Sequence, residues 1–376
     1  MSSSESESRE AKLFEFYART LWPLHRLFVR RKIARRCRRC CVSEKYSPLD
    51  GKGICQICND TPVGQATSAP NTEAMQKELD TILTQTRGSG RYDALVLFSG
   101  GKDSTLLIHL LKTKYPQLRL LAFTFDNSFL SQTAQENIES IIKKLDIDHI
   151  VIRPRPGFCE EVFAYALAHV GTHGCAGAVD PIDGALIFDA ARHHAAQAKI
   201  PLVLIGLSPD QLEQYEGWTS FEADPKFEHS KRTQATIFRI EDLSPEDTSF
   251  WWDATRYPEK DIARVLYPFV AWRFDEDYIK DTVVKLGFME KEKMSPLVTN
   301  NQLIPIENVV DMFHLGYSSW EPEFTKMIRD GRANKLYWRN TFELIEYASK
   351  TGTFISASID KALTRLHLSR KDLGIG

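Results

Sequence analysis

From about residue 74 onward, apolar residues fall in short, nearly continuous runs that alternate with amphipathic or polar segments. Apolar runs of this length are typical of strands buried on both faces of a sheet, and the segments between them have helical periodicity. The predicted strands are 94–98, 120–125, 149–152 and 201–205, and the predicted helices are about 74–87, 104–114, 131–145 and 184–199. This alternation predicts an α/β fold with a doubly wound parallel sheet.

The segments on either side of this pattern differ from it. Residues 1–10 are polar and predict a disordered tail, whereas residues 11–36 predict a helix with one apolar face, interrupted at Pro23. The chain from about residue 225 is mostly helical in pattern and poor in strand signals. We therefore expect a tail with a basic amphipathic helix, a cysteine-rich segment, an α/β domain and a helical C-terminal region, at 1–36, 37–60, 74–224 and 225–376 respectively.

Composition and charge narrow the class of protein. The 376 residues include 48 basic and 50 acidic ones, a formal net charge of -2, so the chain as a whole is not a polycation built to coat nucleic acid. No apolar run approaches the roughly 18 residues of a membrane-spanning helix, and the polar N-terminus does not resemble a secretory signal. These features predict a cytoplasmic protein without a transmembrane segment.

The first strong strand runs into a hexapeptide suited to phosphate binding, Ser99-Gly100-Gly101-Lys102-Asp103-Ser104. In an open parallel sheet, ligands bind at the carboxyl ends of the strands. Two glycines let backbone N–H groups face an anion, the next helix presents its positive end, and Lys102 adds a full charge. The hexapeptide lacks the spacer of a Walker A motif, and no Gly-x-Gly-x-x-Gly turn follows a strand.

This hexapeptide resembles the signature of the PP-loop ATP pyrophosphatases, which have a HUP-like fold and split ATP between the α- and β-phosphates. The resemblance implies ATP and Mg²⁺ as ligands, with Lys102 and Asp103 as catalytic residues and Asp103 organising the metal ion. It also implies that adenine lies against the end of the second strand and that backbone approaches the ligand at Gly206. The implied nucleotide-binding residues are Phe98, Ser99, Gly100, Gly101, Lys102, Asp103, Ser104, Thr124, Phe125, Asp126 and Gly206.

Five of the seven cysteines lie between residues 37 and 58. Cys37-x-x-Cys40 and Cys55-x-x-Cys58 enclose 14 residues, and two such pairs can surround one ion tetrahedrally. Four thiolates favour Zn²⁺, and a site closed by four cysteines contributes to folding rather than to chemistry. Cys41 could replace Cys40 as a ligand, and a redox pair or five independent thiols are the alternatives to a metal site.

The order of a paired-cysteine knuckle, a linker and a PP-loop domain resembles the N-acetyl sugar amidotransferases of surface-polysaccharide biosynthesis. The segments that carry the resemblance are Val170–Cys175, Ile200–Gly206, Leu315–Tyr317 and Ile328–Arg332. It implies a small-molecule, sugar-like substrate whose amide oxygen is adenylated and then replaced by nitrogen from ammonia, supplied by a separate glutaminase. The chain departs from that family at Gly206–Asp210 and Gln214–Gly217, where substrate contacts are expected.

Sulfur transfer to a base, a small molecule or tRNA is the main alternative. Cys175 lies in a glycine-rich loop where sulfur-inserting relatives place a catalytic cysteine, so we include it as a catalytic candidate; it could equally be a small residue in a turn. An iron–sulfur site is disfavoured because Pro296–Asn301 has Asn where several such relatives have a second cysteine. A nucleotide-binding module without turnover is a further alternative.

The basic segment at 26–39 admits three explanations: binding to RNA, binding to an anionic membrane surface or assembly complex, or a solvated helix face. Aromatic residues are few in this segment, so nucleic acid is not the favoured partner.

Overall fold

The computed structural model describes residues 3–60, 72–213, 217, 219–223, 250–290, 294 and 301–375. A five-stranded parallel sheet lies at its centre, with strand order β3-β2-β1-β4-β5. The strands are β1 (Ala94–Leu97), β2 (Leu120–Phe125), β3 (Asp148–Ile152), β4 (Leu202–Leu204) and β5 (Arg264–Leu266). β1 is central, with Leu95 opposite Leu121 of β2 and Val203 of β4. The predicted doubly wound parallel sheet is therefore confirmed.

The fifth strand comes from a region that the sequence pattern assigned to helices. β5 pairs with β4 through Val265 and Leu266, so the sheet extends beyond the predicted domain boundary at residue 224. The pattern missed β5 because it has only three residues, of which Arg264 is exposed at the sheet edge. A short edge strand is stabilised by its neighbour rather than by its own sequence pattern.

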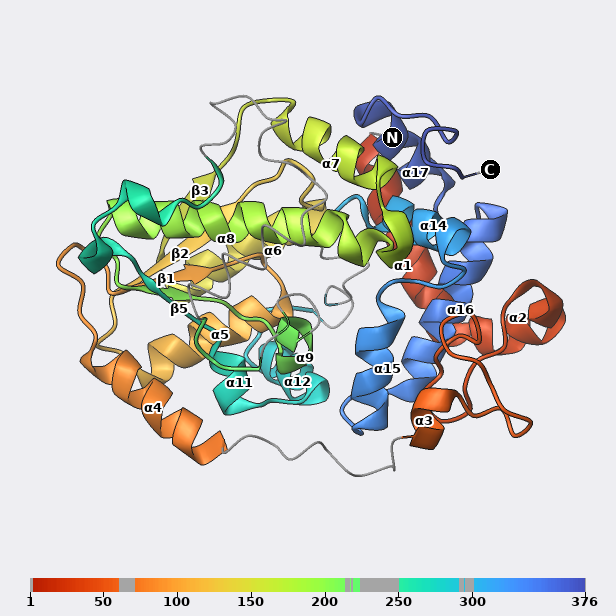
Figure 1. Cartoon of the computed structure of the whole chain (residues 1–376), viewed down its shortest axis with the longest axis horizontal. Helices are drawn as coiled ribbons and strands as arrows, with labels where there is room; N and C mark the ends of the chain where they lie inside the picture. The colour runs from red at the N-terminus through yellow and green to blue at the C-terminus, as the bar shows by residue number, and fades with distance from the viewer. Residues whose placement is uncertain are drawn as a thin grey trace.

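Helices cover the sheet. They are α4 (Thr72–Gln85), α5 (Lys102–Lys114), α6 (Gln132–Leu145), α7 (Phe158–Ala168) and α8 (Val179–Gln197). α8 is long and lies along the sheet against β1, β2 and β4 (Figure 1). α7 is not among the predicted helices, and α8 begins five residues before its predicted start at 184.

The N-terminal segment is helical almost from its beginning. It forms α1 (Ser3–Thr20), α2 (Trp22–Val29) and the 3₁₀ turn η1 (Arg30–Lys32). The predicted disordered tail at 1–10 is therefore wrong for residues 3–10, because Glu10 is fixed by hydrogen bonds from the backbone and hydroxyl of Ser358. The interruption at Pro23 is confirmed, since this proline lies in the first turn of α2.

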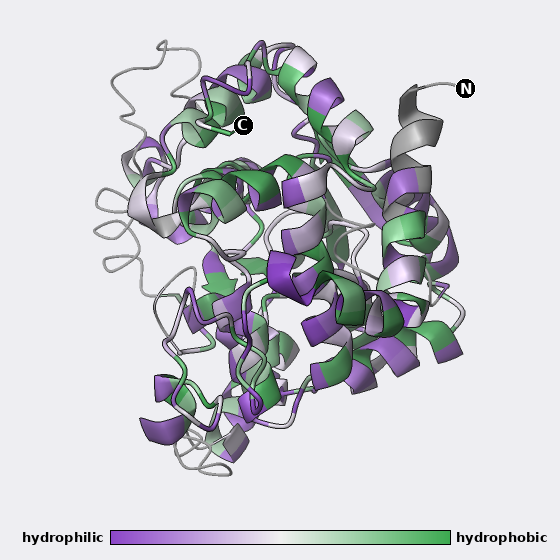
Figure 2. Cartoon of the chain, turned by 90° about the vertical axis from the view of Figure 1, so that its right-hand side faces the viewer, coloured by the Kyte–Doolittle hydropathy of each residue, from purple (hydrophilic) through white to green (hydrophobic). Residues whose placement is uncertain are grey.

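The C-terminal region is helical, as predicted. Its elements are η7 (Ala254–Arg256), η8 (Glu259–Asp261), α11 (Pro268–Trp272), α12 (Glu276–Lys285), α14 (Ile304–His314), α15 (Glu321–Arg329), α16 (Lys335–Thr351) and α17 (Ser356–Arg365). Four short elements precede it: α3 (Gln56–Asp60), η2 (Gly171–His173), η3 (Cys175–Gly177) and α9 (Pro209–Gln211). α1 and α2 pack on α16, and together they enclose a second apolar core that includes Trp22, Trp338 and Phe342. The N-terminal helices α1 and α2 therefore lie beside the C-terminal helix α16 (Figure 1). Figure 2 views the molecule from the right-hand side of Figure 1, and its helices carry both hydrophobic and hydrophilic positions.

No helix in the described part of the chain is long and apolar enough to cross a membrane.

A buried ion triad joins the cysteine-rich segment to the C-terminal helices. Arg36 is buried and lies 2.9 Å from Glu321 of α15 and 3.4 Å from Glu346 of α16. Both carboxylates also accept backbone N–H groups, Glu321 from Ser43 and Glu346 from Ala34. Removing one member of such a group leaves buried charge without a partner, which costs much more than loss of an exposed pair.

We predict that Arg36→Ala lowers the free energy of unfolding by about 3–5 kcal/mol in urea denaturation. The neighbouring Arg35 pairs with Glu44 at the surface, so Arg35→Ala should cost less than about 1 kcal/mol. Equal losses for the two variants would contradict this account of the triad.

Candidate active site

The sheet has one topological switch point, between β1 and β4. From β1 the chain proceeds outward through β2 and β3, and it then returns to add β4 and β5 on the other side. The loops that follow β1 and β4 therefore diverge and open a crevice at the carboxyl edge. A Cβ atom added to Gly206 would lie 3.4 Å from the Cα atom of Ser104. The structure thus brings together the two segments that the sequence analysis assigned to the nucleotide.

The loop after β1 can be built only with glycine at its second position. Gly100 has φ +72°, and a Cβ atom there would lie 2.7 Å from the Ala134 carbonyl oxygen and 2.7 Å from Ile138 Cγ1. Helix α6 therefore packs directly on the loop. Gly101 is the N-cap of α5 and supplies no side chain to cap it, so N–H groups of the first turn are available to an anion.

Lys102 and Asp103 form a close pair at the start of α5, with Lys102 Nζ 2.6 Å from Asp103 Oδ2. Burial acts to lower the pKa of Lys102, but the charges of Asp103, Glu276 and Glu323 outweigh it and raise that pKa. Lys102 therefore remains a cation at neutral pH, as phosphate binding requires.

Two acidic residues that the sequence analysis missed, Glu276 and Glu323, act on the charge of Lys102, and a third acid, Asp210, acts on Glu323. Asp210 of α9, Glu276 of α12 and Glu323 of α15 are all buried. Burial, together with the charge of Asp210, raises the pKa of Glu323 to about 8. Asp210 instead receives two hydrogen bonds from Arg332, at 2.5 and 3.0 Å. Neither Glu276 nor Glu323 belongs to a motif, so only tertiary packing brings them close enough to act on Lys102.

The residues expected to contact adenine lie at the end of β2 with their side chains engaged within the protein. Thr124 Oγ1 donates to the Phe98 carbonyl oxygen at 2.6 Å, and Phe125 is buried in the core. Asp126 pairs with Arg153, whose Nε lies 2.9 Å from the carboxylate. Phe98 is likewise buried in the core. Adenine contact at these positions stays a prediction.

Cys175 lies in a turn that is held by a buried acid. Its backbone N–H donates to Asp311 Oδ1 at 2.8 Å, and its Sγ lies 3.5 Å from the Glu307 carbonyl oxygen. A Cβ atom on Gly174, which has φ +64°, would lie 2.5 Å from Asp311 Oδ1. Cys175 is 1% exposed, and burial raises the pKa of its thiol well above the usual value, with Asp311 and Glu307 adding to the effect. The thiol is therefore protonated in this conformation.

Further acids continue from this turn toward the end of β2. Asn127 Nδ2 donates to Asp183 Oδ1 at 2.9 Å, and burial raises the pKa of Asp183 to about 6. Burial raises the pKa of Asp180 to about 8. Carboxyls with raised pKa values at the carboxyl edge of a sheet are typical of functional sites. Most of Pro296–Asn301 and of Gln214–Gly217 lies outside the described residues.

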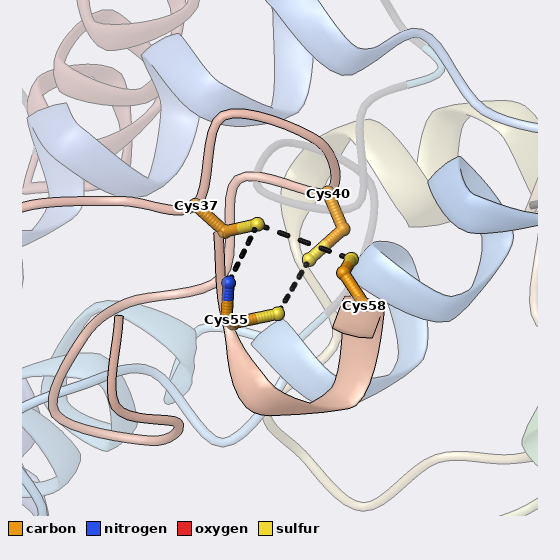
Figure 3. Close-up of side chains that lie close together, drawn as sticks. All are labelled: Cys37, Cys40, Cys55 and Cys58. Atoms are coloured by element: carbon orange, nitrogen blue, oxygen red, sulfur yellow. Dashed lines mark hydrogen bonds between the residues drawn. The ribbon is translucent and has the colours of Figure 1, made fainter. Parts of the chain in front are cut away.

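The four paired cysteines meet in one cluster (Figure 3). Cys37 and Cys58 Sγ atoms are 3.9 Å apart, and those of Cys40 and Cys55 are 3.7 Å apart. Four sulfurs at about 2.3 Å from a tetrahedral ion would be roughly 3.8 Å from one another, so the spacing fits such an ion. Hydrogen bonding from Cys40 lowers the pKa of Cys37 to about 4.

Cys41 does not join this cluster. It has φ +63°, its side chain is buried in the second core, and burial raises its pKa to about 12. The structure therefore favours Cys40 over Cys41 as the fourth member of the group. The identity of the ion stays a prediction, with Zn²⁺ as the ion that four thiolates favour.

We predict that Cys37→Ser abolishes stoichiometric metal binding and lowers thermal stability, whereas Cys41→Ser keeps about one ion per chain. Metal content of the purified variants, measured by mass spectrometry of the elements, checks this. Retention of the ion by Cys37→Ser, or its loss from Cys41→Ser, would show that the ligand set is wrong.

Comparisons with known proteins bear on the segment around the loop. Residues 93–169 match the family model described as queuosine biosynthesis protein QueC. The chain is 33% identical over 111 residues to the uncharacterized protein MJ1599 of Methanocaldococcus jannaschii, which covers 29% of this chain and 38% of that protein. The chain thus spans less than half the length of this curated relative.

Three solved structures resemble the chain at low sequence identity. The U34-tRNA thiolase NcsA from Methanococcus maripaludis, with its [4Fe-4S] cluster, is 12% identical, with a TM-score of 0.33 over 80% of this chain and 87% of its own. NMN synthetase from Francisella tularensis is 13% identical, with a TM-score of 0.36 over 74% and 94%. NH3-dependent NAD synthetase from Campylobacter jejuni is 14% identical, with a TM-score of 0.27 over 47% and 89%. Similarities this weak carry no argument about the substrate.

Proposed function

We propose that this chain, which belongs to the PP-loop ATP pyrophosphatase superfamily, adenylates an oxygen of a small-molecule acceptor and lets nitrogen from ammonia replace it. The observation that carries the proposal is the loop at 99–104, which lies within the matched segment and at the switch point of the sheet. An N-acetyl sugar is the acceptor class that the sequence resemblance favours, with ammonia delivered by a separate glutaminase.

The loop supports pyrophosphate as the leaving group. The first N–H groups of α5 and the ammonium of Lys102 would bind the β- and γ-phosphates, where negative charge develops as the bond to the α-phosphate breaks. Mg²⁺ would neutralise part of that charge when bound, and Asp103, the one carboxylate within the loop, could hold it. Lys102 and Asp103 neutralise each other in the free protein. When the metal nucleotide binds, Lys102 would pair with a phosphate and Asp103 with Mg²⁺, so two ion pairs would replace one.

Glu276 and Glu323 support the site as positioning residues. Both come from the C-terminal region. Burial acts to raise the pKa of Glu276, but the charges of Lys102 and Lys280 outweigh it and hold that pKa low, so Glu276 is ionised and favours the ammonium form of Lys102. Glu323, with a pKa of about 8, adds its charge only as it ionises above neutral pH. The C-terminal helices would therefore complete the nucleotide site rather than form an independent unit.

Nitrogen transfer is favoured over sulfur transfer by the state of Cys175. A sulfur carrier must present a thiolate to its donor and acceptor, whereas this thiol is buried and protonated. Sulfur transfer remains the alternative, and it requires the turn at 174–177 to move away from Asp311. A nucleotide-binding module without turnover is the second alternative, and it does not account for the Lys102–Asp103 pair.

We predict AMP and pyrophosphate when the protein is incubated with ATP, Mg²⁺, ammonium chloride and a set of nucleotide N-acetyl sugars. Lys102→Ala should reduce AMP formation by about 100-fold or more, because the variant loses charge stabilisation of the leaving group. Lys114→Ala, at the exposed end of the same helix, should remain within about threefold of the wild type. Formation of ADP and phosphate alone, or full activity of Lys102→Ala, would contradict the proposal.

The donor is tested with Cys175→Ser. We predict that ammonium-dependent product formation stays within about threefold of the wild type, because the thiol takes no part in the chemistry. Mass spectrometry of the product distinguishes nitrogen from sulfur incorporation. If the variant still releases pyrophosphate but forms no product, Cys175 is a sulfur carrier and the nitrogen assignment is wrong, while adenylation stands.

A further inference from the structure

The N-terminal helices have a second apolar face that nothing in the described part of the chain covers. In α2, Trp22 and Val29 are buried toward α16, and Trp22 Nε1 donates to Glu343 at 3.0 Å. A different stripe of the same helix, at positions i, i+3 and i+4, is apolar and exposed: Leu24 is 66% exposed, Leu27 50% and Phe28 86%. Leu21, one turn earlier, is 46% exposed. One apolar face of α2 packs on α16, and an exposed second apolar face is typical of a surface that contacts another molecule.

Unpaired positive charge adjoins this stripe. Residues 16–43 contain nine basic residues and no acidic one. Four of the nine are neutralised by ion pairs: Arg19 by Glu15, Arg26 by Glu343, Arg35 by Glu44, and Arg36 by Glu321 and Glu346. Arg30 and Arg31, in η1 directly after the stripe, are exposed and have no ion-pair partner among the residues that the structure describes. Lys32 is exposed beside them.

We propose that the lipid-binding face, defined as Leu21, Leu24, Leu27, Phe28, Arg30, Arg31 and Lys32, binds the surface of an anionic lipid bilayer. In an interfacial helix, apolar side chains enter the boundary between headgroups and acyl chains, and nearby cations remain at the level of the phosphates. The apolar stripe of α2 followed by three cations fits both layers. α2 also lies at the outer edge of the molecule, on the side away from the sheet, so a bilayer could reach it without covering the crevice (Figure 1).

Charge and side-chain type disfavour the other occupants of this face. A symmetric dimer through it would bring the cations of both copies into one interface, and residues 16–43 contain no acidic residue that could neutralise them. RNA would neutralise the cations, and one base could stack on Phe28, but RNA would leave three exposed leucines against phosphates or base edges. An anionic bilayer satisfies the charges and the leucines together.

Vesicle binding of the full chain tests the proposal. We expect co-flotation with phosphatidylcholine vesicles that contain about 30% phosphatidylglycerol, and little binding to phosphatidylcholine alone, because each cation near an anionic surface contributes separately. The double variant Leu24→Ser and Phe28→Ser should bind at least about 50-fold more weakly. The double variant Arg30→Gln and Arg31→Gln should lose roughly 20- to 30-fold, and binding by the wild type should fall as salt is raised.

A matched control removes exposed apolar groups elsewhere. Val284→Ser with Leu286→Ser, at the end of α12, should leave vesicle binding unchanged. Circular dichroism and thermal unfolding establish that each variant is folded, and the charge variant tests the face without altering its apolar residues. Absence of binding to anionic vesicles overturns the proposal. The proposal is also overturned if the wild type is a dimer and the leucine–phenylalanine variant is a monomer. It is overturned as well if the wild type binds tRNA but not vesicles, and the arginine variant loses the binding to tRNA.

Discussion

The candidate site depends on the close approach of three backbone segments around residues 99–104. Helix α6 packs so tightly on the loop that a Cβ atom at Gly100 would collide with Ala134 and Ile138, and the segment after β4 meets the first turn of α5 at Gly206. Both contacts lie where the sheet reverses its winding, so the loop is enclosed from two sides while its helix N-terminus faces the crevice. This packing holds Lys102 and Asp103 in place before any ligand binds, which is the condition for electrostatic stabilisation of a leaving group.

The remaining parts of the chain act on this loop from outside the sheet. The triad of Arg36, Glu321 and Glu346 joins the cysteine cluster to α15 and α16. α15 in turn carries Glu323, and α12 carries Glu276, both of which act on the charge of Lys102. A metal ion in the cysteine cluster, far along the chain from the loop, would thus stabilise the helices that act on the candidate site.

Much of the sheet and both motifs could be predicted because their signals are local. The strands β1 to β4 are apolar runs, the loop is a contiguous hexapeptide, and the cysteine pairs have metal-ligand spacing. The sequence did not reveal β5, whose three residues depend on pairing with β4, or the helical state of residues 3–10, which is fixed by contact with Ser358. Glu276 and Glu323 were also missed, since nothing in their neighbourhood distinguishes them from acidic residues on a solvated helix until α12 and α15 pack against the loop.

The most direct test of the central claim is a crystal structure with Mg²⁺ and an ATP analogue that cannot be cleaved between the α- and β-phosphates. The account predicts the β- and γ-phosphates within hydrogen-bond distance of backbone N–H groups of residues 100–104, with the Lys102 ammonium turned from Asp103 toward a phosphate oxygen. A triphosphate bound elsewhere, with residues 99–104 and the Lys102–Asp103 pair unchanged, would contradict it.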